Sequence, residues 1–99
     1  MQDYEVSALH ENQNRIAMSD ALARLHQNND FKMLFSNHLL NALPLALIKI
    51  MTGNAERDIS IVSKLTSIGY VQQYMDEITT EGAKAKVALT ELMQSNNEG

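Results

Sequence analysis

Histidines and acidic residues are the side chains of this sequence that could carry acid–base or metal chemistry. The three histidines, His10, His26 and His38, lie far apart along the chain, and only His10 has a neighbouring carboxylate, Glu11. Adjacent residues of a helix point to different sides, so this pair does not form a two-ligand site. A metal site would have to be assembled by tertiary contacts. We therefore predict no metal site and no cofactor, and interpret the histidines as surface or boundary residues.

Catalytic sequence motifs are missing from the chain. There is no phosphate-binding loop, dinucleotide-binding glycine motif or nucleophile elbow. The absence of cysteine excludes a thiol nucleophile, a disulfide and cysteine-ligated zinc. Asp76, Glu77 and Glu81 are interpreted as a solvated helix face rather than as paired catalytic carboxylates. The sequence therefore predicts a protein that is not an enzyme.

Two tyrosines, Tyr70 and Tyr74, lie one helical turn apart and could stack on a base or a peptide. The alternative is that they pack on neighbouring helices with their hydroxyls at the boundary, and the scarcity of nearby Lys and Arg favours it. The net charge of -4 argues against binding to nucleic acid, which needs clustered basic residues. Met33, Met51 and Met75 are interpreted as core residues rather than as a binding groove.

The longest predicted element is a helix over about 55–93 with a heptad repeat. One heptad position is occupied by Ile61, Ile68, Met75, Gly82 and Leu89. Three residues later come Val71, Ile78, Ala85 and Leu92, with Lys64 as the polar exception. This spacing lets two helices supercoil. At ~1.5 Å per residue such a helix is about 58 Å long, more than one compact core of this size requires.

The seam of this helix has two candidate partners, residues 5–51 of the same chain or a second copy. The helix outruns the remaining elements, which favours the second copy. The predicted protein-interaction residues are Met75, Ile78, Gly82, Ala85, Leu89 and Leu92. Small residues at Gly82 and Ala85 let a partner helix approach closely, so we predict a helix crossing there, between copies of the chain. The alternative is that Gly82 is a tolerated bend in an exposed helix.

Shorter helices are predicted ahead of the long one. Residues 3–28 read as a helix with an interruption around 12–14, followed by a turn in which Asp30 is the expected N-cap. A short helix covers 31–40. Pro44 then either lies in the first turn of a new helix capped by Asn41 or kinks one helix. Gly53 is expected to end this region and Asn54 to cap the long helix.

Residues 45–51 are apolar nearly all round, and we expect them to be the most buried part of the protein. The predicted fold is all-α, with residues 15–52 forming a hairpin or small bundle against the first part of the long C-terminal helix. Residues 1–99 make one domain, with 1–14 as a loose arm and 94–99 as a frayed tail. The N-terminus is acidic and lacks the apolar segment of a signal peptide. The longest apolar run, 39–51, is shorter than the ~20 residues that a membrane span needs, so no membrane association is expected.

A series of short segments in this order resembles a known group of proteins. The segments are 21–25 (Ala-Leu-Ala-Arg-Leu), 28–32 (Asn-Asn-Asp-Phe-Lys), 68–74 (Ile-Gly-Tyr-Val-Gln-Gln-Tyr) and the pair Glu81-Gly82 before an alanine-rich end. Over about 21–92 the chain is similar to small helical proteins of tailed bacteriophages, often encoded among virion-assembly genes. It departs from them at Asn29, where the group commonly has Pro, at 36–38, where it has Gly-Tyr, and at Pro44.

The resemblance implies a phage protein that works by assembling or by binding another protein, and it transfers no catalytic residue. The function expected from it is a self-associating, non-enzymatic component of head or virion assembly, located in the host cytoplasm or the virion. Its partners would be further copies of the chain and other phage structural proteins. Two alternatives are a small inhibitor that binds a host defence or regulatory protein, and an oligomerising subunit of the DNA-packaging machinery.

Overall fold

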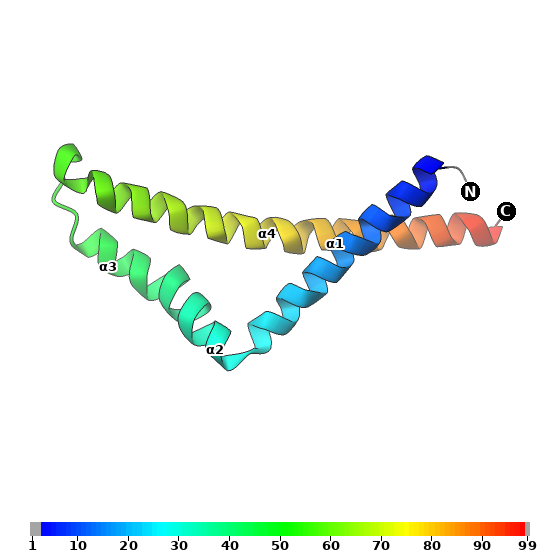
Figure 1. Ribbon diagram of the computed structural model, residues 1–99, viewed down its shortest axis with the longest axis horizontal. Coiled ribbons are helices and arrows are strands. Elements are labelled where there is room, and N and C mark those ends of the chain that lie inside the picture. Colours follow the sequence, from blue (N-terminus) through cyan, green and yellow to red (C-terminus); the bar gives the residue numbers. More distant parts are fainter. Residues whose placement is uncertain (1–2, 99) are drawn as a thin grey trace. The chain divides into compact units, whose positions relative to one another are not determined.

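The computed structural model describes residues 3–98, with side chains for 4–95, and these residues are almost entirely helical (Figure 1). The elements are α1 (Asp3–Gln27), α2 (Asn29–Phe31), η1 (Lys32–Ala42), α3 (Leu43–Lys49) and α4 (Ala55–Glu98). No strand occurs among the described residues. The predicted all-α fold with one long C-terminal helix is confirmed.

α1 lacks the interruption that the sequence indicated, and α4 extends beyond its predicted end. α1 begins at Asp3 and runs without a break through 12–14, so residues 3–14 are not a loose arm. Helix-breaking Gly and Pro are absent from this stretch, and Asn and Gln lower helix propensity only slightly. α4 continues to Glu98, five residues beyond the predicted end. Met1, Gln2 and Gly99, which belong to the predicted arm and tail, lie outside the described residues.

The helices are organised in two units, and each includes part of α4. Unit 1 combines α1 up to Arg24 with α4 from Asp76 onward. Unit 2 covers residues 25–75, which contain the end of α1, the helices α2, η1 and α3, and the first half of α4. Residues 15–24 therefore associate with the second half of the long helix, whereas we had predicted the first half.

The turn after α1 is capped by Asn28, whereas the sequence predicted Asp30 as the cap. Asn28 has an extended backbone, and its side-chain oxygen accepts a hydrogen bond from the Phe31 N–H at 3.0 Å. Asp30 instead lies in the first turn of α2, where a negative charge is favourable. The helix begins two residues earlier than the sequence suggested, and that shift moves the cap from Asp30 to Asn28.

Pro44 lies in the first turn of α3, directly after a π-helix. α2, η1 and α3 follow each other without a break, and Ala42 before α3 provides no side-chain cap. Asn41 is therefore not a cap. The Leu43 N–H donates to the His38 carbonyl, five residues back. In an α-helix Pro44 would leave the carbonyl four residues earlier without a donor and would clash with it. The wider π turn changes this hydrogen-bond pattern just before the proline, and such turns are rare in proteins.

The turn between α3 and α4 confirms two predicted residues and adds a third. Gly53 has a φ of +81°, and Asn54 accepts hydrogen bonds from the N–H groups of Glu56 and Arg57 at 3.0 and 3.1 Å. Asp58 is buried and accepts three hydrogen bonds at 2.9 Å. The donors are the Thr52 N–H, the Thr52 hydroxyl and the Gly53 N–H. Asp58 thus ties the turn to the first turn of α4.

We expect the stability of this turn to depend on pH through Asp58. The hydrogen bond from the Thr52 N–H is the largest cause that lowers the pKa of Asp58 below 3.8. A carboxyl group with a lowered pKa stabilises the fold above its unfolded pKa and loses that contribution as the pH falls through the folded value. The melting temperature should therefore decrease below pH 3.8. Asp58→Asn should have a lower melting temperature near neutral pH and a smaller decrease on acidification. An unchanged acid dependence in this variant would contradict the role of Asp58.

Each unit has a small core. In unit 1, Leu22 and Ala85 are buried, as is Gly82. In unit 2, Leu47, Ile68 and Met75 are buried.

The prediction that residues 45–51 form the most buried part is wrong. Only Leu47, 7% exposed, is buried, whereas Ile48 is 54% exposed. Leu45, Ile50 and Met51 are exposed as well. A helix that is apolar all round needs neighbours on every side, and within one copy only one side of α3 is covered.

Candidate interaction surface

The residues that could carry acid–base or metal chemistry do not form a site in the structure. His10, His26 and His38 are all exposed. Within residues 3–98 no group of three or more His, Asp or Glu side chains could hold a metal ion. The His26 ring instead meets the edge of Phe31, at 5.2 Å between centroids, and Phe31 stacks on Phe35 at 4.9 Å. These contacts support the turn between α1 and α2 and are structural.

The predicted interaction residues of the α4 seam are covered within one copy of the chain. Met75, Gly82 and Ala85 are buried, and Ile78, Leu89 and Leu92 are half-buried. Ala85 is 2% exposed. The heptad pattern therefore identified the inward face of α4 correctly. A single copy thus covers much of this face, while Ile78, Leu89 and Leu92 remain partly exposed.

The close crossing predicted at Gly82 is present, but its partner is α1 of the same chain. A Cβ atom placed on Gly82 would lie 2.6 Å from the Ser19 hydroxyl oxygen, still closer to the Ser19 Cβ, and 3.4 Å from the Arg15 carbonyl oxygen. Glycine at this position is what allows the two helices to approach. The alternative of an exposed bend is wrong, and so is our assignment of the crossing to two copies.

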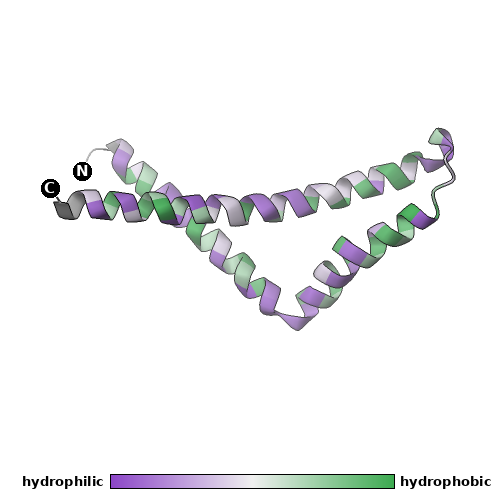
Figure 2. Cartoon of the chain, turned by 180° about the vertical axis from the view of Figure 1, so that it is seen from behind, coloured by the Kyte–Doolittle hydropathy of each residue, from purple (hydrophilic) through white to green (hydrophobic). Residues whose placement is uncertain are grey.

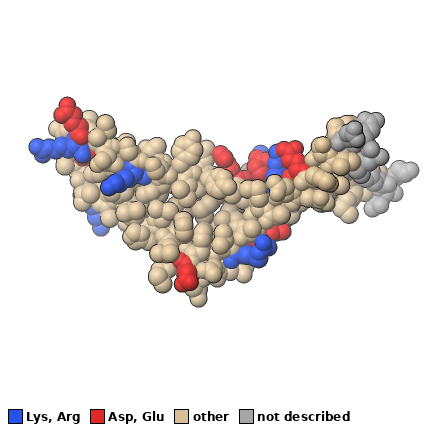
Figure 3. Space-filling model, in the orientation of Figure 1, with Lys and Arg blue, Asp and Glu red and all other residues tan. Residues whose placement is uncertain are grey.

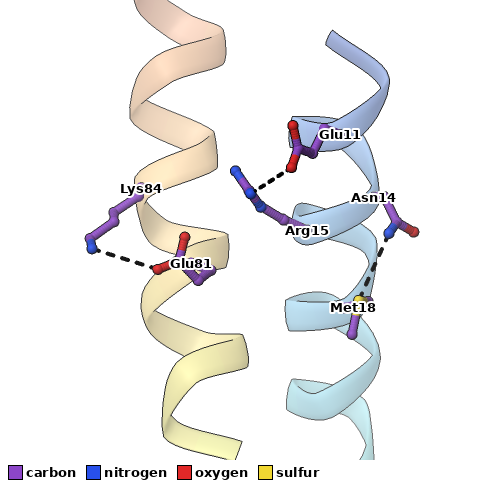
Figure 4. Close-up of polar contacts among 6 residues, drawn as sticks. All are labelled: Glu11, Asn14, Arg15, Met18, Glu81 and Lys84. Atoms are coloured by element: carbon purple, nitrogen blue, oxygen red, sulfur yellow. Dashed lines mark hydrogen bonds and ion pairs between the residues drawn. The ribbon is translucent and has the colours of Figure 1, made fainter. Parts of the chain in front are cut away.

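Charged side chains flank this crossing and keep to the surface. Lys86 of α4 pairs with Asp20 of α1 at 3.5 Å. Figure 4 shows Arg15 projecting from α1 toward α4 while bound to Glu11 at 2.7 Å, and Lys84 pointing away from α1. Exposed pairs of this kind contribute little to stability, typically about 0–1 kcal/mol. Their arrangement is consistent with a structural contact between helices.

The hollow between α3 and α4 in unit 2 lacks the residues of an active site. Its volume is about 320 Å³, and it is lined by Leu43, Ser63, Lys64, Ser67 and Ile68. The lining contains neither a carboxylate nor a histidine, so it offers no acid–base pair.

Large apolar side chains are concentrated on the surface of unit 2. The exposed ones in this unit are Leu25, Met33, Leu34, Phe35, Leu45, Ile48, Ile50, Met51, Ile59, Val62, Tyr70 and Tyr74. Unit 1 exposes only five among its described residues. Figure 2 shows hydrophobic residues along α3 and in the first turns of α4, and Figure 3 shows charged side chains near the turn that joins these two helices.

Several of these positions correct the sequence interpretation. Tyr70 is 72% exposed and Tyr74 is also exposed, so the tyrosines do not pack on neighbouring helices as predicted. Met33 and Met51 are exposed, and of the three methionines assigned to the core only Met75 is buried. The sequence signal for this outer surface is a row of residues spaced by three or four, namely Ile59, Val62, Thr66, Tyr70 and Tyr74, of which only Thr66 is not large and apolar. This row lies outside the heptad positions.

One helical segment, Asn29–Lys49, is long and apolar enough to cross a membrane by length and composition alone. It has 21 residues and is barely buried. The apolar run 39–51, which by itself is too short to span a membrane, lies mostly within this segment. Core helices of soluble proteins pass the same test, so the segment is a weak candidate for a membrane span.

The chain matches no protein-family model, no curated protein and no solved structure.

Proposed function

We propose that this chain is a non-enzymatic bacteriophage protein that self-associates and takes part in head or virion assembly. The resemblance of residues 21–92 to small phage proteins motivates the phage origin and the assembly role. The apolar surface of unit 2 supports self-association: twelve large apolar side chains are exposed there, whereas only three hydrophobic side chains are buried. An apolar surface of this extent in a soluble protein usually marks an interaction site.

A protein partner fits the exposed helix Asn29–Lys49 better than a lipid bilayer does. The middle of this segment contains Ser36, Asn37, His38 and Asn41. Four polar side chains near the centre of a bilayer are costly, because the hydrocarbon region offers them no hydrogen-bond partners. Protein interfaces accommodate polar and apolar side chains side by side.

Light scattering after size exclusion, repeated from low to high micromolar concentration, tests the proposal. We expect a mass of at least a dimer, and the fraction of associated protein should increase as the concentration rises. A protein that stays monomeric over the whole range would contradict self-association. Flotation of the purified protein with phosphatidylcholine vesicles would contradict the choice of a protein partner over a membrane. If the protein oligomerises, its incubation with capsid and portal proteins tests the assembly role, and binding to neither would contradict that role.

A further inference from the structure

We propose that the outward face of α4 in unit 2 pairs with the same face of a second copy, in antiparallel orientation. This face, here named the outer stripe, consists of Ile59, Val62, Thr66, Tyr70 and Tyr74. The inference rests on the proposed self-association and specifies the surface that carries it. The outer stripe takes the role that the sequence predicted for the α4 seam, because much of that seam is covered within one copy.

The outer stripe lies on the side of α4 opposite to the buried residues. Its members are spaced by three, four, four and four residues, and at about 100° per residue they fall within roughly 120° of the helix circumference. On the same wheel Ile68, which is buried, lies about 180° from Ile59. The first half of α4 thus carries large apolar residues on both sides. The inner side packs within the chain, and the outer side is open.

The outer stripe is highly exposed and suited to a protein contact. Tyr70 is 72% exposed and Ile59 is 68% exposed, and Val62 and Tyr74 are exposed as well. Tyrosine is enriched at the centres of protein interfaces, since it provides a large apolar area with a polar tip. With roughly 150–250 Å² per aromatic side chain, the two tyrosines alone offer about 200–300 Å². The aliphatic members bring the stripe to a large part of the ~800 Å² that each partner of a standard interface buries.

The residue at the centre of the outer stripe, Thr66, has a small side chain whose hydroxyl already makes a hydrogen bond within the helix. The Thr66 hydroxyl donates to the Val62 carbonyl at 2.8 Å, and the neighbouring Ser67 hydroxyl donates to the Ser63 carbonyl at 2.9 Å. Burying these hydroxyls against another helix therefore leaves no donor without an acceptor. Small residues at this point also allow two helices to approach closely. The large residues lie on either side of this centre.

This size pattern suits a twofold axis near Thr66. In an antiparallel pair centred there, Ile59 of one copy faces Tyr74 of the other, and Val62 faces Tyr70. Every large aliphatic residue then contacts a tyrosine ring, and the same residues on both copies are used. Such a self-complementary surface is what an isologous dimer requires.

The charge pattern of the outer stripe permits contact with a second copy. The chain has a net charge of -4, so two copies repel wherever their acidic surfaces meet. The outer stripe contains no charged residue, which permits close contact between copies. Glu56 and Glu77 lie three residues before and after it along α4, and in the antiparallel pair they face each other. Association through the stripe should consequently strengthen as salt screens this repulsion.

Disulfide trapping tests the antiparallel register, because the natural chain contains no cysteine. We expect Thr66→Cys to form a covalent dimer rapidly under mild oxidation, since the twofold axis brings the two cysteines together. Val87→Cys, at a position 59% exposed and outside the stripe, is the control and should cross-link at least tenfold more slowly. Equal rates for the two variants would overturn the register.

Lysine substitutions test the surface itself. Val62→Lys and Tyr70→Lys should convert the oligomer to monomers or weaken association at least tenfold, with the helical circular dichroism unchanged. Val87→Lys, which alters the net charge by the same amount, should keep the parental mass. Because lysine lowers the net negative charge, loss of association would not come from general repulsion. If the parent oligomerises and both stripe variants keep its mass, the outer stripe is wrong while self-association stands. A monomeric parent overturns both proposals.

Discussion

Leu47→Asp is expected to destabilise the protein by about 3–5 kcal/mol, because it removes a buried leucine side chain and leaves a carboxylate without a partner. Such a loss is a large share of the ~5–15 kcal/mol by which a domain of this size is stable. The structure separates Leu47 from its neighbour Ile48, although the sequence treats them alike. Leu47 is 7% exposed and Ile48 is 54% exposed. Ile48→Asp, measured at a concentration where the chain is monomeric, should therefore change the free energy of unfolding by only ~0.5 kcal/mol.

Urea denaturation of the two variants beside the parent measures this difference. The matched pair has the same new side chain, the same helix and adjacent positions, so helix propensity and net charge cancel in the comparison. Equal destabilisation of both variants would mean that Ile48 is covered in the monomer. Two variants as stable as the parent would mean that α3 does not belong to the core.

Gly82→Ala is expected to destabilise the α1–α4 contact of unit 1 by about 1–3 kcal/mol, the usual range for overpacking. The added methyl group would meet the Ser19 side chain and would lie 3.4 Å from the Arg15 carbonyl oxygen. A Cβ atom is attached directly to the backbone, so Ser19 cannot yield without moving α1. Gly82→Ala should therefore lower the stability of the protein even though alanine has a better helix propensity than glycine by ~1 kcal/mol.

Gly69 provides the matched control for Gly82. Both glycines lie inside α4, but a Cβ atom on Gly69 would have nothing within 4 Å. Gly69→Ala should therefore stabilise the protein by up to ~1 kcal/mol through propensity alone. Ser19→Gly combined with Gly82→Ala should recover most of the loss, because it removes the atoms that clash. If Gly82→Ala stabilises the protein as Gly69→Ala does, α1 does not cross α4 at this point.

Local sequence signals determined the helices and the ends of several of them. The seven-residue repeat of apolar side chains identified the inward face of α4, and Ile68, Met75 and Ala85 are buried as it predicted. Gly53 and Asn54 occupy the expected positions between α3 and α4, since a left-handed backbone and an N-cap are requirements of the chain itself. Such features depend on residues within one or two turns, and the sequence alone contains them.

Tertiary structure decided which apolar surfaces are covered and by what. Residues 45–51 and the first half of α4 are apolar on more than one side, so the sequence could not indicate which side the chain covers. In the structure Leu47 is covered while Ile48 is open, and Tyr70 faces solvent although Met75 is buried. The same holds for Gly82, whose small size predicted a close crossing but not that Ser19 of α1 would form it. Hydrophobic burial is non-directional and follows the area removed from water, so the identity of the partner surface depends on how the helices meet in three dimensions.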